Sequence, residues 1–281
     1  MRRILLITGI STGIGAHLAR FFHERGYFIL GTVRKTKSAP TWTKELEYLH
    51  LFEMDLTDPS SVELVFEQIK DFLKSEKIYG LINNAGIAVA GPMLYLPMES
   101  FNRQMMINVT GLLDVTQRCF PLMMSDNARI INISSVSGLQ SSPFLGAYSA
   151  SKFAVEAISD SLRLEAALLG IKVVLVEPGT IQTPIWQKND LLASEYQDTE
   201  YGPYLSQAKI IMQQIEQKAL PLTALEKPLI HALEAAAPRN RYLIYKHPIL
   251  LKILIRFIPG KWKDYFTISY LKTMALKNKI K

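Results

Sequence analysis

Residues 3–25 read RILLITGISTGIGAHLARFFHER and join three unlike segments. A short aliphatic run predicts a buried strand, and the residues after Gly15 carry apolar side chains at helical spacing. Between them lies Thr8-Gly9-Ile10-Ser11-Thr12-Gly13-Ile14-Gly15, with three glycines in eight residues. Glycines here permit a tight turn and let the backbone approach a phosphate at a helix N-terminus. An ordinary strand-to-helix turn is the alternative explanation.

The alternation of strand and helix continues over the first 180 residues. The predicted strands span residues 3–8, 27–33, 48–54, 78–83, 128–134, 171–177 and, after a gap, 241–245. The predicted helices include residues 13–25, 59–73, 101–124 and 147–168. Continuously apolar strands separated by helices predict a parallel sheet that is covered on both faces. We therefore expect an α/β fold with a doubly wound, Rossmann-like sheet of about seven strands.

Residues 182–222 interrupt this alternation, because they contain three prolines, several aromatic residues and no clean strand. A segment of that length within a domain usually closes over a ligand. We expect residues 1–245 to form a single dinucleotide-binding domain that includes this lid. Residues 246–281 are then a basic, helical C-terminal extension.

Composition narrows the class of protein. The chain has 281 residues, of which 48% are hydrophobic and 20% charged, so it can bury a sizeable core and is not disordered. A single cysteine, Cys119, excludes an internal disulfide and favours a reducing compartment. One cysteine and 5 scattered histidines predict no metal site. The apolar runs 4–7 and 249–258 are too short for a secretory signal or a membrane span, so we expect a cytoplasmic protein.

The formal net charge of +7 is concentrated at one end of the chain. Residues 246–281 hold nine Lys and Arg and one acidic residue, which leaves the rest of the chain near neutral. This argues against a nucleic-acid partner, which needs positive charge on the folded face. Apolar and basic residues alternate in the extension, so it has three possible roles: peripheral contact with an anionic membrane, a solvated helix, or a cover over the substrate cavity. We expect the cover, because Phe257, Trp262, Tyr265 and Phe266 offer a large apolar area.

Five motifs occur together at characteristic spacing. They are the glycine-rich stretch T-G-x-x-x-G-x-G from Thr8, Asn83-Asn84-Ala85-Gly86, Ser135 thirteen residues before Tyr148, the Tyr148-x-x-x-Lys152 pair, and Pro178-Gly179. In order and spacing they resemble the classical short-chain dehydrogenase/reductase family, up to about residue 245. The general pattern is similar to its hydroxysteroid and retinol dehydrogenase branch. The resemblance implies an oxidoreductase that acts on CH–OH or C=O groups.

The resemblance implies a catalytic quartet of Asn108, Ser135, Tyr148 and Lys152. Tyr148 and Lys152 are four residues apart and share one face of a helix. A nearby ammonium, helped by an oxidised nicotinamide, favours the phenolate, so we expect the two to lower the tyrosine pKa and make Tyr148 an acid and base. Ser135 would hold the substrate oxygen, and Asn108 would stabilise a water next to the lysine. Taken singly, a tyrosine on a helix usually packs, and Asn108 could be a buried structural amide.

The second predicted strand ends in Gly31-Thr32-Val33-Arg34-Lys35-Thr36-Lys37. Val33 stands where NAD-dependent members of the family carry an aspartate, and Arg34 suits a 2′-phosphate. We therefore expect NADP, with NAD possible, since Thr12 stands where a second NADP marker would be basic and an exposed basic turn is the alternative. The resemblance implies these cofactor-binding residues: Gly9, Ser11, Thr12, Gly13, Ile14, Gly15, Arg34, Asp55, Leu56, Asn84, Ala85, Gly86, Tyr148, Lys152, Pro178, Gly179, Ile181 and Thr183.

Apolar residues on the loops near the predicted pocket are Val89, Met93, Leu139 and Phe144. They favour a small hydrophobic ketone, aldehyde or secondary alcohol as substrate, although an apolar lid that only packs on the core would look the same. The resemblance also implies a homodimer or homotetramer formed through the helices near 101–124 and 147–168. The alternative function is a catalytically silent protein that senses dinucleotides on the same fold. The complete set of Ser135, Tyr148 and Lys152 argues against it, because a sensor has no need of them.

Overall fold

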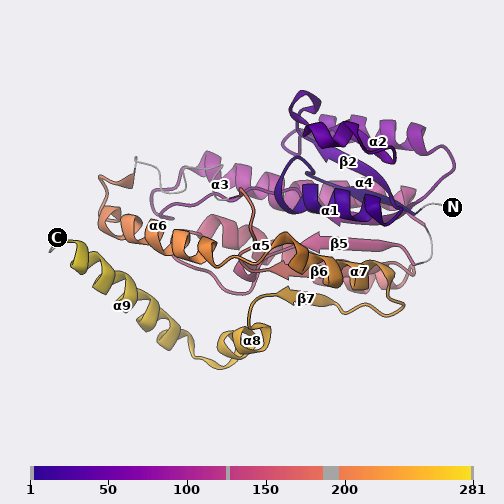
Figure 1. Cartoon of the computed structure of the whole chain (residues 1–281). Coiled ribbons are helices and arrows are strands. Elements are labelled where there is room, and N and C mark those ends of the chain that lie inside the picture. The colour runs from indigo at the N-terminus through magenta and orange to yellow at the C-terminus, as the bar shows by residue number, and fades with distance from the viewer. Residues whose placement is uncertain (1–2, 125–126, 186–195, 280–281) are drawn as a thin grey trace.

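Seven parallel strands form one sheet in the order β3-β2-β1-β4-β5-β6-β7 in the computed structural model, which describes residues 3–124, 127–185 and 196–279 (Figure 1). The strands are β1 (Ile4–Ile7), β2 (Phe28–Val33), β3 (Leu49–Glu53), β4 (Ile78–Asn83), β5 (Arg129–Ile133), β6 (Lys172–Pro178) and β7 (Arg241–Ile244). The helices are α1 (Gly13–Glu24), α2 (Pro59–Leu73), α3 (Met98–Met105), α4 (Gly111–Cys119), α5 (Gly146–Ala167), α6 (Gly202–Gln217), α7 (Glu226–Glu234), α8 (Pro248–Phe257) and α9 (Gly260–Lys279). The predicted fold class is confirmed.

Alternate residues of β1 face opposite layers of helices. Leu5 and Ile7 belong to one hydrophobic core, which they share with residues of α1 and α7. Ile4 and Leu6 belong to a second core, which contains residues of α2, α4 and α5. Because every residue of β1 is buried, the strand has no polar face, as is typical of parallel sheets.

The sequence predicts one helix over residues 101–124, and the structure is helical from Met98 to Leu122 but not as one regular α-helix. The structure has α3, then a π-helical turn at Met106–Thr110, then α4, and a short 3-10 turn at Phe120–Leu122. Pro121 cannot continue an α-helix, which accounts for the end of α4. The π-helical turn contains Asn108, whose side chain is bonded to a neighbouring loop and not to its own helix. Such turns are common at functional positions.

The segment 182–222, predicted as a lid, contains α6, and its residues 186–195 lie outside the described part of the chain. After β7 the chain forms α8 and α9, and α9 contacts α6 (Figure 1). Within the described ranges, no helix combines the length and apolar character that crossing a membrane requires.

Candidate active site

The glycine-rich loop after β1 has no room for side chains at two of its glycines. Gly9 has a φ of +72°, and a Cβ there would lie 2.8 Å from the Cα of Ala85. A Cβ at Gly15 would lie 2.3 Å from the carbonyl oxygen of Gly9. Thr12 is exposed and Ser11 is half-buried, so the turn is open to solvent where α1 begins. The loop therefore offers a close-fitting backbone cradle at a helix N-terminus, which suits a pyrophosphate.

The Asn-Asn-Ala-Gly stretch after β4 is tied to this loop. The Asn84 side chain donates hydrogen bonds to the carbonyl oxygens of Thr8 (2.8 Å) and Gly9 (3.1 Å). The backbone N–H groups of Asn84 and Ala85 both donate to the Thr8 hydroxyl at 3.0 Å. These four bonds hold the ends of two adjacent strands together. The Asn-Asn-Ala-Gly motif therefore holds the glycine-rich loop in position, a structural role that its sequence alone does not show.

Three of the predicted catalytic side chains are buried close together, at the ends of β5 and α5. The Tyr148 hydroxyl is hydrogen-bonded to Ser135, which lies two residues after the end of β5. Lys152 donates from Nζ to the carbonyl oxygen of Ile133 at 2.8 Å, and its Nζ lies 5.8 Å from the centre of the Tyr148 ring. The structure therefore brings a hydroxyl, a phenol and an ammonium into one cluster.

Burial dominates the ionisation of this cluster. It raises the pKa of Tyr148 above its ordinary value, and the hydrogen bond with Ser135 only partly opposes this. The sequence predicts a lowering by Lys152 with the help of an oxidised nicotinamide. Burial acts in the opposite direction, because it removes hydration from the phenolate. Burial also lowers the pKa of Lys152 to about 8, while the charge of Glu156 opposes that shift. Both groups are therefore held nearer to neutrality than in water.

Asn108 is buried, and its amide is engaged by the loop after β4. It accepts from the Ile87 N–H at 2.9 Å and donates to the Ile87 carbonyl at 2.9 Å and to the Ser151 hydroxyl at 3.1 Å. Gln104, which the sequence analysis missed, grips the same loop: it donates to the Ile87 carbonyl at 2.7 Å and accepts from the Val89 N–H at 2.6 Å. Its position one helical turn before Asn108 is the only signal that could have found it.

The sequence analysis also missed a charged cluster behind Lys152. Arg241, on β7, donates to Glu156 at 3.0 Å and to both oxygens of Asp160 at 2.9 Å. Its Nε lies 3.1 Å from Oε1 of Glu177 on β6. Burial and the charge of Glu156 raise the pKa of Glu177 to about 7. Three carboxyl groups thus share one guanidinium. The spacing of four residues between Lys152 and Glu156 places both on one face of a helix, and it is the signal in the sequence that could have indicated the cluster.

The residues predicted to hold the adenosine end lie after β2 and β3. Arg34 is exposed. Burial opposes ionisation of Asp55, but hydrogen bonds from the N–H and hydroxyl of Thr57 (2.9 and 2.7 Å) and the charge of Arg34 lower its pKa. Leu56 packs against Gly111, where a Cβ would come within 3.0 Å of the leucine Cβ. These predicted residues therefore meet at one end of the sheet.

The Pro178–Thr183 stretch lies across the same edge. A Cβ at Gly13 would lie 3.4 Å from the Thr183 side chain, so this segment reaches the glycine-rich loop. The Gly179 N–H donates to the carbonyl of Ile244 at 2.9 Å, which joins the turn to β7. Ile181 is buried and pairs with Leu220, at the far end of the predicted lid. The predicted nicotinamide side and the phosphate side are therefore adjacent.

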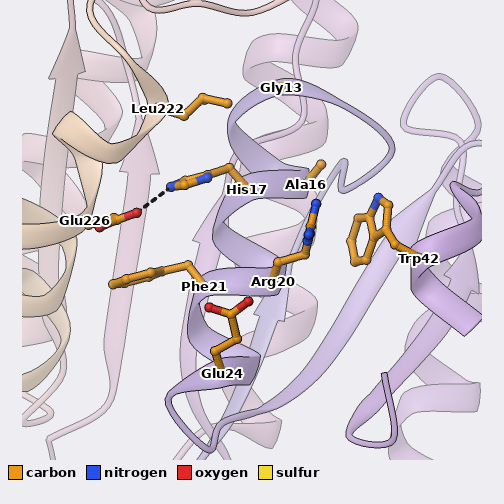
Figure 2. A pocket seen from close by; sticks show the side chains of 9 residues that line it. All are labelled: Gly13, Ala16, His17, Arg20, Phe21, Glu24, Trp42, Leu222 and Glu226. Carbon is orange, nitrogen blue, oxygen red and sulfur yellow. Dashed lines mark ion pairs between the residues drawn. The ribbon is translucent and has the colours of Figure 1, made fainter. Parts of the chain in front are cut away.

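Two surface hollows flank this edge. One, of about 340 Å³, is lined by Ile181, Gln182, Thr183, Pro184, Glu216 and Ala219, next to the predicted site. The other, of about 430 Å³, lies against the outer side of α1, where His17 and Glu226 form an ion pair at 3.1 Å and Arg20 lies over the Trp42 ring (Figure 2). Of the predicted cofactor-binding residues, only Gly13 lines the second hollow, and none of the predicted catalytic residues does.

Comparison with known proteins gives a consistent result. The family model described as short chain dehydrogenase matches residues 3–191. The chain is 33% identical over 279 residues to an NADPH-dependent 3-dehydrocapnine reductase of Ornithobacterium rhinotracheale, with 97% of this chain and 99% of that protein covered. It is 34% identical over 274 residues to retinol dehydrogenase 5 of Homo sapiens, with 92% and 86% covered.

The fold is similar to a short chain dehydrogenase from Burkholderia cenocepacia solved in complex with NADP. The two superpose with a TM-score of 0.70 at 22% identity, covering 91% of this chain and 94% of that one. Retinol dehydrogenases among the relatives agree with the branch that the sequence motifs predict. The chain therefore belongs to the short-chain dehydrogenase/reductase family, and it is an NAD(P)-dependent oxidoreductase that acts on CH–OH and C=O groups.

Proposed function

We propose that the protein transfers a hydride between NADP(H) and a small hydrophobic ketone, aldehyde or secondary alcohol, with Tyr148 as the acid and base. The observation that carries this proposal is the buried cluster in which the Tyr148 hydroxyl is bonded to Ser135, next to Lys152. The cluster lies at the same edge of the sheet as the glycine-rich cradle. A binding protein without turnover would have no use for a buried acid at that position.

The nicotinamide, when bound, supplies or accepts the hydride. In the reductive direction, the Ser135 hydroxyl holds the substrate oxygen and Tyr148 gives it the proton that the new alcohol needs. The raised pKa keeps the phenol protonated at neutral pH, which suits this direction. Lys152 stabilises the phenolate that remains until a proton returns from solvent. In the oxidative direction the same groups move the proton the opposite way.

NADP is favoured by the turn after β2. Its cations Arg34, Lys35 and Lys37 are exposed. The Glu53 carboxylate accepts hydrogen bonds from the backbone N–H and the hydroxyl of Thr36 at 2.8 and 2.9 Å. This carboxylate holds the basic turn in place while it leaves Arg34 free to approach a 2′-phosphate. The relative named as an NADPH-dependent reductase, which spans nearly all of this chain, supports the same cofactor.

A hydrophobic substrate is favoured by the loops around the cluster. Phe144 and Tyr201 meet edge to face at 5.9 Å, and Tyr95 meets Tyr201 at 6.0 Å. Phe144 adopts a φ of +65°, a costly conformation for an aromatic residue that is found most often where function requires it. These side chains join α6 to the loops before α3 and α5, and they give the site an apolar rim.

We further propose that residues 1–245 form the catalytic domain with 182–222 as its lid, and that two or four copies assemble in the cytoplasm. Exposed apolar residues on α5, among them Phe153 (45% exposed) and Leu164 (64%), favour association through this helix and the α3–α4 region. The basic extension 246–281 is the part that would contact a membrane. Light scattering of the purified full-length protein measures the size of the assembly.

A redox assay tests the function directly. The purified protein is given a panel of hydrophobic ketones and aldehydes with NADPH or NADH, and oxidation of the cofactor is followed. We expect turnover with NADPH to exceed turnover with NADH. Tight NADPH binding without turnover across the panel, and without turnover of secondary alcohols with NADP⁺, would support the silent dinucleotide sensor instead.

A further inference from the structure

The helix α8 is strongly apolar and yet has no buried residue. Its sequence is PILLKILIRF, and the side chains of Ile249 and Phe257 are 74% and 73% exposed. A helix with this composition normally lies in a protein core or against another apolar surface. Here it follows β7 at the edge of the sheet, with Leu250, Ile253 and Leu254 also open to solvent. We therefore expect a binding partner, here called the occupant, to cover the apolar side chains of α8.

The next helix extends the same kind of surface. On α9 the side chains of Trp262, Tyr265 and Phe266 are 61%, 67% and 59% exposed. They lie against one another, with ring centres 6.2 Å apart for Trp262 and Phe266. Lys263 on α9 donates to the carbonyl of Ile255 on α8 at 3.0 Å, which connects the two helices. The pair forms one exposed surface, here called the α8–α9 surface, which comprises the described side chains of residues 248–273.

Charge decides which occupant fits. Basic side chains in and beside the α8–α9 surface are Lys246, Lys252, Arg256, Lys261, Lys263 and Lys272, and Asp264 is the acidic one there. A second copy would bring the same positive charge against it. A cover over the chain's own pocket would bury the four aromatic residues named for that role, but all four are mostly exposed. Since α9 contacts α6, the cover stays a prediction for that helix, while the exposed aromatic side chains are open to another occupant. Apolar and aromatic side chains among cations match an anionic lipid interface.

We propose that the α8–α9 surface docks the protein on an anionic membrane, with α8 lying in the plane of the interface and the aromatic side chains at the start of α9 beside it. Trp262 and Tyr265 suit the headgroup level, and the lysines suit the lipid phosphates. At ten residues, α8 is far too short to cross. Figure 1 shows α9 beside α6 at the end of the molecule toward which the strands run, and the two helices contact each other. Docking would therefore bring the predicted lid and the apolar rim near the lipid.

The test uses the full-length protein with vesicles of phosphatidylcholine, alone or with phosphatidylglycerol. We expect co-sedimentation with the anionic vesicles, weakened by salt, and a blue shift of tryptophan emission that Trp262→Phe removes. Lys252→Glu with Arg256→Glu should weaken binding about tenfold or more, because each cation near a charged membrane contributes roughly 1 kcal/mol. The control, Lys44→Glu with Lys70→Glu, makes the same charge change at exposed positions elsewhere and should bind nearly as the unchanged protein does.

A second variant separates the apolar contribution from charge. Ile249→Ser with Phe257→Ser should also release the protein from vesicles while circular dichroism stays unchanged. The proposal is overturned if the unchanged protein ignores anionic vesicles, or if the α8 variants and the control bind equally. It is also overturned if the variants instead dissolve a dimer seen by light scattering, which would make a second copy the occupant. Turnover of a water-soluble ketone should survive in all these variants, so this outcome is independent of the proposed function.

Discussion

The cluster around Arg241 and the α8–α9 surface lie close together along the chain but are opposite in character. In the cluster, polar groups are paired and two carboxyl groups are buried: Arg241 donates to Glu156 and Asp160 and forms an ion pair with Glu177, and the side chains of Glu156 and Glu177 are 9% and 2% exposed. On α8, apolar groups are exposed, and Phe257 is 73% accessible. Buried charge is costly unless it is paired, whereas exposed apolar area is normally covered by something. The contrast therefore separates a region whose charges are paired within the chain from a region whose apolar side chains we expect a partner to cover.

The largest expected effect tests whether the buried cluster is catalytic. Tyr148→Phe removes the proton donor but keeps the ring, so hydride transfer should fall by roughly 10²–10⁴-fold or more while NADPH still binds. Stopped-flow measurement of NADPH oxidation checks the rate, and cofactor fluorescence checks binding. Tyr265→Phe, which makes the same change on the α8–α9 surface, should leave the rate unchanged. Near-normal turnover in Tyr148→Phe would remove the proposed mechanism.

The next effect concerns stability. Arg241→Met leaves three carboxyl groups without their shared cation. Two of these groups, Glu156 and Glu177, are buried, while the Arg241 side chain itself is 33% exposed. We expect the free energy of unfolding to drop by about 2–4 kcal/mol, somewhat below the loss for a fully buried pair. Arg118→Met breaks pairs with Glu63 and Asp114, whose side chains are 61% and 26% exposed and so keep water when the cation is lost, and should cost at most about 1 kcal/mol. Urea denaturation of the two variants measures these losses. Equal losses of unfolding free energy would show that burial in the Arg241 cluster does not increase the loss.

A third effect tests the cofactor assignment. Arg34→Ala should weaken NADPH binding by roughly ten- to a hundredfold and leave NADH nearly unaffected, because a charge-assisted hydrogen bond contributes about 1.5–3 kcal/mol. Titration calorimetry with each dinucleotide measures this directly. Lys70→Ala, at an exposed position on α2, is the matched control. Parallel losses for both cofactors would make Arg34 a structural residue.

A smaller effect links the Arg241 cluster to the predicted catalytic lysine. Burial lowers the pKa of Lys152 to about 8 and Glu156 opposes the shift, so Glu156→Gln should lower that pKa further. If activity requires the ammonium, the alkaline fall of kcat/KM should move to lower pH. Glu165→Gln, an exposed change on the same helix, should leave the profile in place. An unchanged profile in Glu156→Gln, with Tyr148→Phe inactive, would reject this coupling and leave the mechanism intact.

The lowered pKa of Lys152 also predicts how its contribution to the free energy of unfolding changes with pH. Its pKa in the folded protein lies below the ordinary 10.5, so the native state binds fewer protons than the unfolded chain between about pH 8 and 10.5. The contribution of Lys152 to the free energy of unfolding therefore rises with pH across that window. Denaturation of the unchanged protein and of Lys152→Met at pH 8 and pH 10 isolates this contribution. A fall with pH that is specific to Lys152 would contradict the lowered pKa.

The smallest effect should come from the α8–α9 surface. Phe257→Ala removes a mostly exposed ring, so the free energy of unfolding in the absence of lipid should change by no more than about 0.5 kcal/mol. Phe22→Ala, a fully buried change on α1, should cost about 3–5 kcal/mol. Chemical denaturation of both variants checks the difference. A large loss in Phe257→Ala would mean that α8 packs on the body in solution.

Short-range patterns were enough to predict the sheet and the motifs. Buried parallel strands are continuously apolar, so the positions of β1 to β7 can be inferred from runs such as Ile4–Ile7 without any tertiary information. The glycine-rich loop follows from the steric limits of its own backbone, and Gly9 has the positive φ that only glycine adopts without cost. The spacing of Tyr148 and Lys152 places both on one face of a helix. These features depend on neighbours along the chain.

Contacts between distant segments depended on the fold. The π-helical turn at Asn108 exists beside a loop twenty-one residues away, and Arg241 reaches Glu156 across eighty-five residues. No periodicity encodes such pairings, since they arise only after the strands have taken their order in the sheet. Burial also raises the Tyr148 pKa, against the lowering expected from Lys152 and an oxidised nicotinamide, because desolvation is a property of the packed protein and not of a sequence motif. The exposure of Phe257 and Trp262 likewise depends on the tertiary structure, because composition predicts how much apolar area a segment has but not which other segments cover it.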